Sequence, residues 1–256
     1  MKQISIIIPA YNEESRISET LDSYINYFNK NQKNKFEIIV IPNGCKDKTI
    51  DIVKEYRKKY NFVRFKEIKA AMGKGRAIIK GLEIANSPIL GFVDADNSTE
   101  PEEFDKLIKE LKKTDADCVI ASRWIKGAQM KPKQPLARRI ASRCFNFLVK
   151  MLFGIKVKDT QCGSKIFRKK PLKEIIPLLK TSRWAFDVDI LYNLRKKKRK
   201  VFEYPIIWKN KTGSNLRIKK QGPEMFFEIV KLRMIHSPFK FIIKFYNKSK
   251  TSNRGK

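Results

Sequence analysis

Short apolar runs alternate with amphipathic stretches along the first half of the chain. Five runs rich in Ile, Val and Phe predict buried strands: Ile4–Pro9, Phe36–Pro42, Phe62–Ile68, Ile89–Asp94 and Cys118–Ala121. Four stretches between them predict helices: Glu13–Phe28, Lys48–Tyr60, Lys74–Ala85 and Pro101–Leu111. This alternation predicts an α/β fold with a mainly parallel central sheet flanked by helices.

The second half of the chain has a less regular pattern. A helix is predicted over Leu136–Phe153, where apolar residues recur at helical spacing: Ile140, Cys144, Phe147, Leu148, Met151 and Leu152. Strands are predicted within Lys165–Arg168 and Val201–Trp208. A second amphipathic helix is predicted over Pro223–Tyr246, with Phe239, Ile242, Ile243 and Tyr246 on one face. We therefore divide the chain into a catalytic domain at 1–220 and a basic, amphipathic C-terminal helix and tail at 221–256.

The charge balance points to an anionic partner. The chain has 256 residues, with 57 Lys+Arg against 26 Asp+Glu, which gives a net charge of +31. A hydrophobic share of 42% is enough for a sizeable core, so the chain is not a disordered basic tail. Because +31 is far above what solubility requires, we expect the partner to be nucleic acid, a phosphorylated ligand or an acidic membrane surface.

The histidine and cysteine content excludes several classes of site. His236 is the only histidine, which excludes a zinc site built on several histidines. The four cysteines are scattered, with no C-x-x-C pair, so we expect free thiols in a reducing compartment. No apolar run approaches the roughly 18 residues of a membrane span, and the N-terminus lacks the pattern of a signal peptide.

Polar residues follow directly after the predicted strands. In open α/β sheets, ligands bind outside the carboxyl ends of the strands, where Tyr11-Asn12-Glu13, Asn43-Gly44-Cys45 and Asp94-Ala95-Asp96 are placed. Asp94 and Asp96 are a carboxylate pair suited to Mg²⁺ or Mn²⁺, and Ser98 could supply a further oxygen. The alternative is a loop whose aspartates only cap the helix that begins at Pro101.

The order of these motifs resembles the inverting family-2 glycosyltransferases. They are Ile6-Ile7-Ile8-Pro9-Ala10-Tyr11-Asn12-Glu13-Glu14, Asn43-Gly44-Cys45-Lys46-Asp47-Lys48-Thr49, Gly73-Lys74-Gly75 and Val93-Asp94-Ala95-Asp96. Later motifs look like those of the dolichyl-phosphate β-glucosyltransferases and the related mannose synthases: Asp159–Gly163, Arg183–Asp189 and Trp208 with Gly213–Leu216. The resemblance implies the GT-A fold over residues 1–220. It also implies transfer of a sugar from UDP-glucose, or alternatively GDP-mannose, to a polyprenyl (dolichyl) phosphate on the cytoplasmic face of a membrane.

The resemblance also implies roles for individual residues on the donor side. Pro9, Tyr11 and Glu13 would line the nucleoside pocket, Lys74 would approach the nucleotide, and Asp94 and Asp96 would hold nucleotide and metal. Asn43 lies in the nucleotide-binding segment but departs from the family, which usually has Asp-Asp-Gly-Ser where this chain has Pro42-Asn43-Gly44-Cys45. Because asparagine is uncharged and also presents donors, the identity of the base stays open, as does a weakened nucleotide site.

On the acceptor side, the resemblance assigns cations to the lipid phosphate. Arg123, Arg138 and Ser142 match the acceptor-phosphate contacts, and Lys209 near Trp208 is a further candidate. The alternative for any one of these cations is a solvated basic surface. A phosphate monoester is largely dianionic at neutral pH and needs no general base. Asp187 or Asp189 nevertheless occupies the region where relatives with hydroxyl acceptors place that base, so a glycan acceptor stays an alternative.

Both amphipathic helices could lie in an anionic membrane interface, with cationic positions beside their apolar stripes. We expect peripheral binding to the membrane, directly or through a membrane-protein partner; the alternative is that the stripes pack on the core. A nucleic-acid-binding protein is the rival from another class, with the cluster Arg195–Lys200 as its basic surface. We favour the enzyme and expect no nucleic-acid partner, because the chain shows no recognition helix, zinc finger or RNA-stacking signature.

Overall fold

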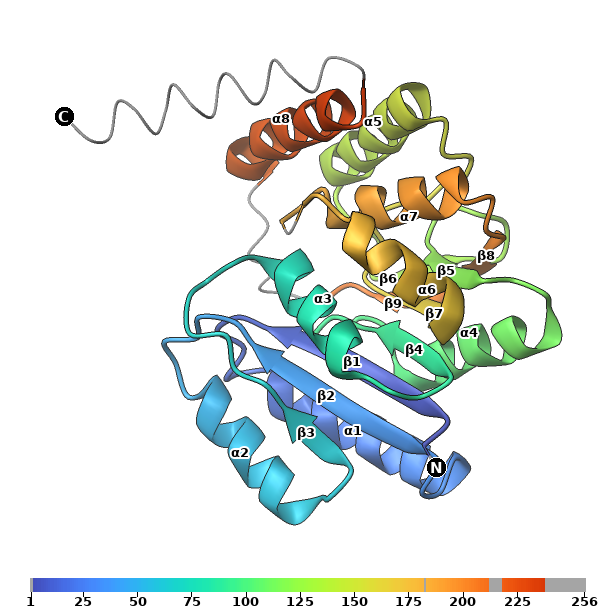
Figure 1. The fold of residues 1–256 in the computed structure, drawn as a ribbon. Helices are drawn as coiled ribbons and strands as arrows, with labels where there is room; N and C mark the ends of the chain where they lie inside the picture. The colour runs from blue at the N-terminus through green and yellow to red at the C-terminus, as the bar shows by residue number, and fades with distance from the viewer. Residues whose placement is uncertain (1, 182, 212–217, 238–256) are drawn as a thin grey trace.

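The computed structural model describes residues 2–181, 183–211 and 218–237, with the backbone alone at 218–221. A seven-stranded sheet forms the centre of the molecule (Figure 1). Its strands are β1 (Ile4–Ala10), β2 (Phe36–Pro42), β3 (Val63–Phe65), β4 (Ile89–Phe92), β5 (Cys118–Ser122), β7 (Lys165–Arg168) and β8 (Val201–Pro205). The short strands β6 (Gln129–Lys131) and β9 (Ile207–Lys209) pair separately.

The strand order of the large sheet is β3-β2-β1-β4-β7-β5-β8. Strand β7 runs antiparallel to both of its neighbours, β4 and β5, whereas the other pairs are parallel. The predicted α/β fold with a mainly parallel sheet is therefore confirmed. Parallel strands place their carboxyl ends at the same edge of the sheet, and this brings the loops after β1, β2 and β4 together.

Helices cover both faces of the sheet, which explains why the strands read as continuous apolar runs. The helices are α1 (Ile17–Asn31), α2 (Thr49–Lys59), α3 (Lys74–Ile84), α4 (Pro101–Lys113), α5 (Leu136–Phe153), α6 (Lys169–Ile175), α7 (Phe186–Lys196) and α8 (Ile218–Ile235). One core cluster joins α1, α2 and α4 to alternate strand residues such as Ile6 and Ile8. The other joins α3 and α5 to α8 with the opposite residues, such as Ile7.

Most predicted elements lie where expected, but several boundaries shift. Helix α1 begins at Ile17, not Glu13, because the preceding loop is held by the start of α2. The Glu13 N–H donates to Thr49 Oγ1 at 2.8 Å, and the Glu14 N–H donates to Asp47 Oδ2 at 3.0 Å. The Phe62–Ile68 run forms only a three-residue strand.

The C-terminal helix begins earlier than predicted and belongs to the core. Helix α8 starts at Ile218, so the predicted boundary between residues 220 and 221 falls inside it. Ile229 and Leu232 are buried in the core cluster that also contains α3 and α5. The predicted apolar face from Phe239 to Tyr246 and the motif at Gly213–Leu216 lie outside the described residues. Within the described part, no helix is both long and apolar enough to cross a membrane.

The basic cluster Arg195–Lys200, considered above as a surface for nucleic acid, does not lie on a single helix. Helix α7 ends at Lys196, and Lys198 has a left-handed backbone conformation with φ of 54°. Beyond this turn, Arg199 forms an ion pair with Glu174 and Lys200 forms one with Asp115. Acidic partners therefore occupy part of the cluster, which makes it a poor continuous surface for nucleic acid.

Candidate functional site

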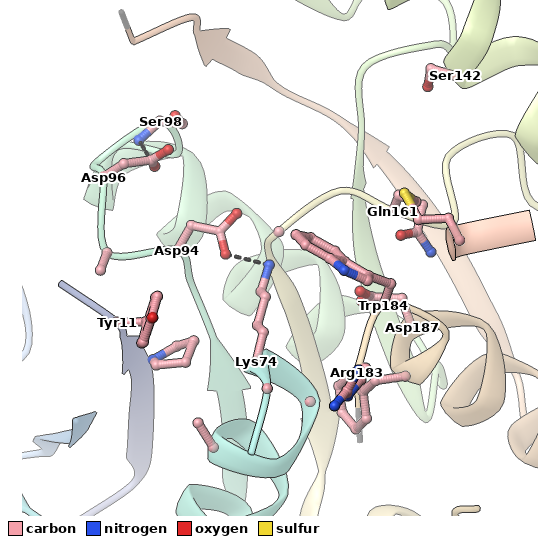
Figure 2. A pocket seen from close by; sticks show the side chains of 18 of the residues that line it. Tyr11, Lys74, Asp94, Asp96, Ser98, Ser142, Gln161, Arg183, Trp184 and Asp187 are labelled. Atoms are coloured by element: carbon pink, nitrogen blue, oxygen red, sulfur yellow. Dashed lines mark hydrogen bonds and ion pairs between the residues drawn. The ribbon is translucent and has the colours of Figure 1, made fainter. Parts of the chain in front are cut away.

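A cavity of about 1030 Å³ opens at the carboxyl ends of the central strands and extends to α5 and α8. It brings together residues from across the chain, and Figure 2 shows part of its lining. The predicted site residues that line it are Pro9, Tyr11, Glu13, Asn43, Lys74, Asp94, Asp96, Ser98, Arg123, Arg138, Ser142 and Asp187. Lys209 is not among the lining residues: its Nζ lies 2.5 Å from Glu100 Oε1, and Lys211 lines the cavity instead.

The loop after β4 carries Asp94 and Asp96 into this cavity and is held in place by α1. Thr20 Oγ1 donates to the Ala95 carbonyl at 2.8 Å, and the Tyr24 hydroxyl donates to the Thr99 carbonyl at 2.7 Å. The Asp96 carboxylate accepts the Ser98 N–H at 2.9 Å. Burial, and next the charge of Asp94, raise the pKa of Asp96 above its ordinary value. The loop therefore concentrates negative charge that a cation can relieve.

Lys74 reaches from the start of α3 to this loop (Figure 2). Its Nζ lies 2.5 Å from Asp94 Oδ1. Burial lowers the pKa of Lys74, but the charges of Asp94 and Asp187 outweigh burial, so the pKa lies above its usual range. A Cβ at Gly163 would collide with Asp94 Oδ2, so a larger residue there would displace the carboxylate. Both contacts fix the orientation of Asp94.

The part of the cavity that was predicted to receive the nucleoside is built from the loops after β1 and β2. Burial raises the pKa of Glu13, and the Asp96 charge adds to this, while Arg16 opposes it through an ion pair of 2.7 Å. The Asn43 amide oxygen accepts the Met72 N–H at 3.0 Å. This bond takes one of the two acceptor positions of the amide oxygen, so Asn43 is partly committed to holding the backbone at Met72.

Arg123 is held by a buried carboxylate at the cavity wall. Its Nε and Nη2 donate to the two oxygens of Asp159 at 2.8 and 2.9 Å, and its backbone N–H donates to the same side chain. The guanidinium also lies 5.4 Å from the ring centroid of Trp208. A bidentate pair leaves the outer N–H groups of the fork for other partners. Arg123 is thus a pre-oriented cation and not a solvated surface residue.

Helix α5 supplies Arg138 and Ser142 to the cavity lining, and Figure 2 shows Ser142 on the opposite side of the view from Asp94. Burial lowers the pKa of Arg138, and the positive charge of Arg123 lowers it further. Two guanidinium groups whose charges act on each other favour an anion between them. This arrangement is what a phosphate-binding site requires, and it supports the predicted acceptor side.

Of the two candidate bases, only Asp187 lines the cavity. Asp189 is fully buried and accepts backbone N–H groups of Lys180 and Thr181, and its other oxygen lies 3.1 Å from His236 Nε2. Its carboxylate is therefore committed to holding the chain around α7. Asp187 forms an ion pair with Lys165, whose Nζ lies 2.5 Å from Asp187 Oδ1.

Several lining residues received no role from the sequence: Arg16, Gln134, Gln161, Arg183, Trp184 and Lys211. Gln161, Arg183 and Trp184 do lie in motifs that carried the family resemblance. The amide nitrogens of Gln134 and Gln161 are buried and have no hydrogen-bond partner among the described residues, so a ligand could use them. Gln134 and Lys211 lie in segments without a recognisable motif, and only the fold brings them here.

The residues after β4 fit a divalent cation that is completed by a substrate. Among the described residues, no three His, Cys, Asp or Glu side chains cluster tightly enough to hold a metal alone. Asp94 and Asp96 supply carboxylates, and the buried Ser98 hydroxyl has no hydrogen-bond partner within the described structure. Mg²⁺ and similar ions are often held by one or two carboxylates together with substrate phosphates.

Comparison with known proteins agrees with this geometry. The sequence profile of the family described as "Glycosyl transferase family 2" matches residues 5–176. The chain is 33% identical to the dolichyl-phosphate beta-glucosyltransferase of Dictyostelium discoideum, over 90% of this chain and 73% of the relative. It is 31% identical to the enzyme of the same name from Saccharomyces cerevisiae, over 91% of this chain and 75% of the relative.

Among solved structures, the chain resembles glucosyl-3-phosphoglycerate synthase from Mycobacterium tuberculosis, in a complex with Mn²⁺, uridine diphosphate and glucosyl-3-phosphoglycerate. The TM-score is 0.66 at 18% identity, and the match covers 91% of this chain and 79% of the other. At this identity the likeness concerns the fold alone, and it confirms the predicted GT-A type of architecture.

Proposed function

The chain belongs to glycosyl transferase family 2, and from this premise we propose that it transfers glucose from UDP-glucose to dolichyl phosphate or a related polyprenyl phosphate. The transfer inverts the configuration at the anomeric carbon. The relatives named above support the acceptor and the sugar. GDP-mannose as donor is the alternative within the same family.

One observation carries this proposal: the carboxylate loop and the cations of α5 line the same cavity. In this proposal Asp94, Asp96 and Lys74 hold the donor, and Arg138 with Ser142 holds the acceptor; all five residues line the cavity. A nucleotide sugar and a phosphate acceptor can therefore meet between them. Arginine suits a phosphate because its planar fork offers two parallel hydrogen bonds.

The proposed reaction does not need a residue of the protein to remove a proton from the acceptor. An oxygen of the lipid phosphate attacks the anomeric carbon on the side opposite the leaving diphosphate. Arg138, Ser142 and the outer edge of Arg123 orient the attacking phosphate. Lys74 stabilises negative charge on the donor side. Because the attacking oxygen is already ionised, no residue has to remove a proton from it.

We assign a divalent cation, Mg²⁺ or Mn²⁺, to Asp94 and Asp96, with Ser98 as a further oxygen donor. The observations that support this are the paired carboxylates and the buried hydroxyl without a hydrogen-bond partner in the described structure. A cation bound there neutralises charge on the departing nucleoside diphosphate. The Mn²⁺ in the related synthase structure is consistent with this assignment.

We place the enzyme peripherally on the cytoplasmic face of a membrane, with α5 and α8 toward an anionic leaflet. The two helices lie side by side in the upper part of Figure 1. Along α5, the side chains of Leu136, Ile140, Phe147 and Met151 are more than half exposed, as is Phe227 on α8. Exposed Arg143 and Lys150 adjoin this apolar stripe. Apolar side chains beside cations favour an anionic lipid surface.

A transfer assay tests the function directly. Purified protein receives radiolabelled UDP-glucose or GDP-mannose with Mn²⁺, and polyprenyl phosphate in anionic vesicles or a soluble glycan as acceptor. We expect label in the lipid fraction from UDP-glucose, and calorimetry to show tighter binding of UDP than of GDP. A preference for GDP would overturn the choice of sugar donor, and transfer to the glycan alone would overturn the acceptor.

A further inference from the structure

The segment that leads into β7, from Gly163 to Lys165, contacts two different carboxylates of the cavity. Lys165 opens the strand and pairs with Phe92, two residues before Asp94. Gly163 lies against the Asp94 carboxylate, as described above. The Lys165 ammonium lies 2.5 Å from Asp187 Oδ1. A single short segment thus determines where both Asp94 and Asp187 lie.

The side chain of Lys165 is fully buried among the described residues. Its side chain is 0% exposed, and its Nζ also donates to the Cys162 carbonyl at 2.8 Å and lies 5.5 Å from the centre of the Phe92 ring. Lysine is almost never fully buried unless it is paired. Asp187 is the acidic partner, and its carboxylate faces the cavity as well. The pair therefore links the buried core to the reaction site.

We propose that Lys165 is a positioning residue that holds the Asp187 carboxylate in the cavity wall as a counter-charge for Lys74, and that Asp187 does not serve as a general base. The Lys165 ammonium is fully buried and forms its ion pair with Asp187, which keeps that carboxylate in one place. The inference rests on the proposed function, in which the attacking phosphate oxygen has no proton to lose.

The fixed charge also acts across the cavity. Asp187 contributes electrostatically to the environment of Lys74, which itself is paired with Asp94. Lys165, Asp187, Lys74 and Asp94 therefore alternate in sign from the core to the donor site. Lys165 itself does not line the cavity, and Asp187 is the cavity carboxylate with which it forms an ion pair, so we expect its main effect on turnover to pass through Asp187.

A double-mutant cycle tests this dependence with Lys165→Met, Asp187→Asn and the double variant. We expect Asp187→Asn to lower kcat for transfer to polyprenyl phosphate about ten- to a hundredfold, with the Kd for UDP changed less than about threefold. The double variant should match Asp187→Asn within about threefold, because Lys165 then has no charged partner to hold. A double variant that is slower by the product of the two single losses would overturn the inference.

The size of the Asp187→Asn effect is a second criterion. General base catalysis contributes about 10²–10⁴-fold, so a loss above about a thousandfold with the phosphate acceptor would show that Asp187 is a base and overturn the inference. Lys173→Met is the matched control, because Lys173 Nζ also donates to backbone carbonyls, those of Leu82 and Glu83, away from the cavity. Its turnover should equal that of the wild type.

Thermal unfolding of the same variants gives a readout that needs no acceptor. Removing one partner of a buried pair is costlier than removing both, so the double variant should melt higher than Lys165→Met. If Lys165→Met does not fold, the turnover of the double variant compared with that of Asp187→Asn still tests the inference. A wild type that transfers nothing to polyprenyl phosphate contradicts the proposed function alone, whereas a double variant no more stable than Lys165→Met contradicts this inference.

Discussion

At the scale of single residues, the proposal has Asp94 and Asp96 act through their charge, since both line the cavity and neither packs in the apolar core. We expect Asp94→Asn and Asp96→Asn each to lower kcat by at least about a hundredfold, because a bound metal ion supplies several kcal/mol of charge stabilisation. The size of the side chain is kept, so the fold should persist. Steady-state transfer assays and electron paramagnetic resonance of Mn²⁺ binding measure the two effects.

Asp51→Asn is the control for these variants, because Asp51 is exposed on α2 and far from the cavity lining. It should bind Mn²⁺ and turn over like the wild type. Turnover near the wild-type value in either cavity variant would mean that the metal is held elsewhere.

Arg138 is the residue whose loss should separate the acceptor from the donor. We expect Arg138→Ala to lower kcat/KM for polyprenyl phosphate about ten- to a hundredfold, because a charge-assisted hydrogen bond is worth roughly 1.5–3 kcal/mol. The Kd for UDP, measured by calorimetry, should not change, since the proposal assigns Arg138 to the acceptor alone. Arg57→Ala on exposed α2 is the control. Unchanged transfer by Arg138→Ala would remove this residue from the acceptor site.

At the scale of the element, helix α5 has two apolar faces, one buried in the core and one exposed to solvent. Val149 and Phe153 are buried, and Leu148 and Leu152 pack against the same core cluster. Phe147 and Met151 are 64% and 70% exposed on another face. The apolar stripe predicted from the residue spacing is therefore part buried and part exposed, because only one side of the helix packs against the rest of the protein. Only the exposed edge is available to a membrane.

We expect Phe147→Glu and Met151→Glu to reduce binding to anionic vesicles and transfer to vesicle-borne acceptor, while UDP binding stays unchanged. Each change removes exposed apolar area and adds a charge that anionic lipid repels. Vesicle sedimentation at increasing salt measures the effect, and wild-type binding should weaken as salt screens the charges. Phe202→Glu is the matched control, because Phe202 is exposed on the edge strand β8. Equal binding by all three variants would show that α5 does not contact the leaflet.

At the scale of the whole molecule, the Arg123–Asp159 pair makes stability depend on pH. Burial raises the pKa of Asp159, but the charge and hydrogen bonds of Arg123 outweigh it, so the pKa lies below its ordinary value. A carboxyl group whose pKa is lowered by folding stabilises the protein above its ordinary pKa, near 3.8. This contribution is lost as the pH falls through the lower, folded-state pKa.

We expect Asp159→Asn to lower the melting temperature by about 6–20 °C at pH 7, since breaking a buried pair costs about 3–5 kcal/mol and 1 kcal/mol shifts Tm by about 2–4 °C. The difference from the wild type should begin to shrink as the pH falls below about 3.8, where Asp159 of the unfolded chain becomes protonated, and it should vanish below the lower, folded-state pKa. Calorimetric scans from pH 3 to 7 measure it. Asp115→Asn, in an exposed pair with Lys200, should change Tm little. A pH-independent difference would contradict this account.

The sequence by itself determined the architecture and the location of the donor site. Apolar runs of four to seven residues between amphipathic stretches specify a sheet covered on both faces, because such strands have no polar side to expose. Polar residues directly after these runs specify the carboxyl edge of that sheet. Of the fourteen residues considered for the site, all but Lys209 and Asp189 line one cavity, which reflects how closely side-chain position follows from the end of a strand.

Tertiary structure alone decided which polar groups are free and which are already used. Lys209 and Lys211 are lysines only two positions apart in the sequence, yet only Lys211 lines the cavity. Asp187 and Asp189 both lie in the first turn of α7, and only their partners, Lys165 and a set of backbone N–H groups, separate their roles. These partners are distant in sequence or depend on how the chain turns. Since hydrogen bonds and ion pairs depend on distances of a few ångströms, residue order alone cannot assign them.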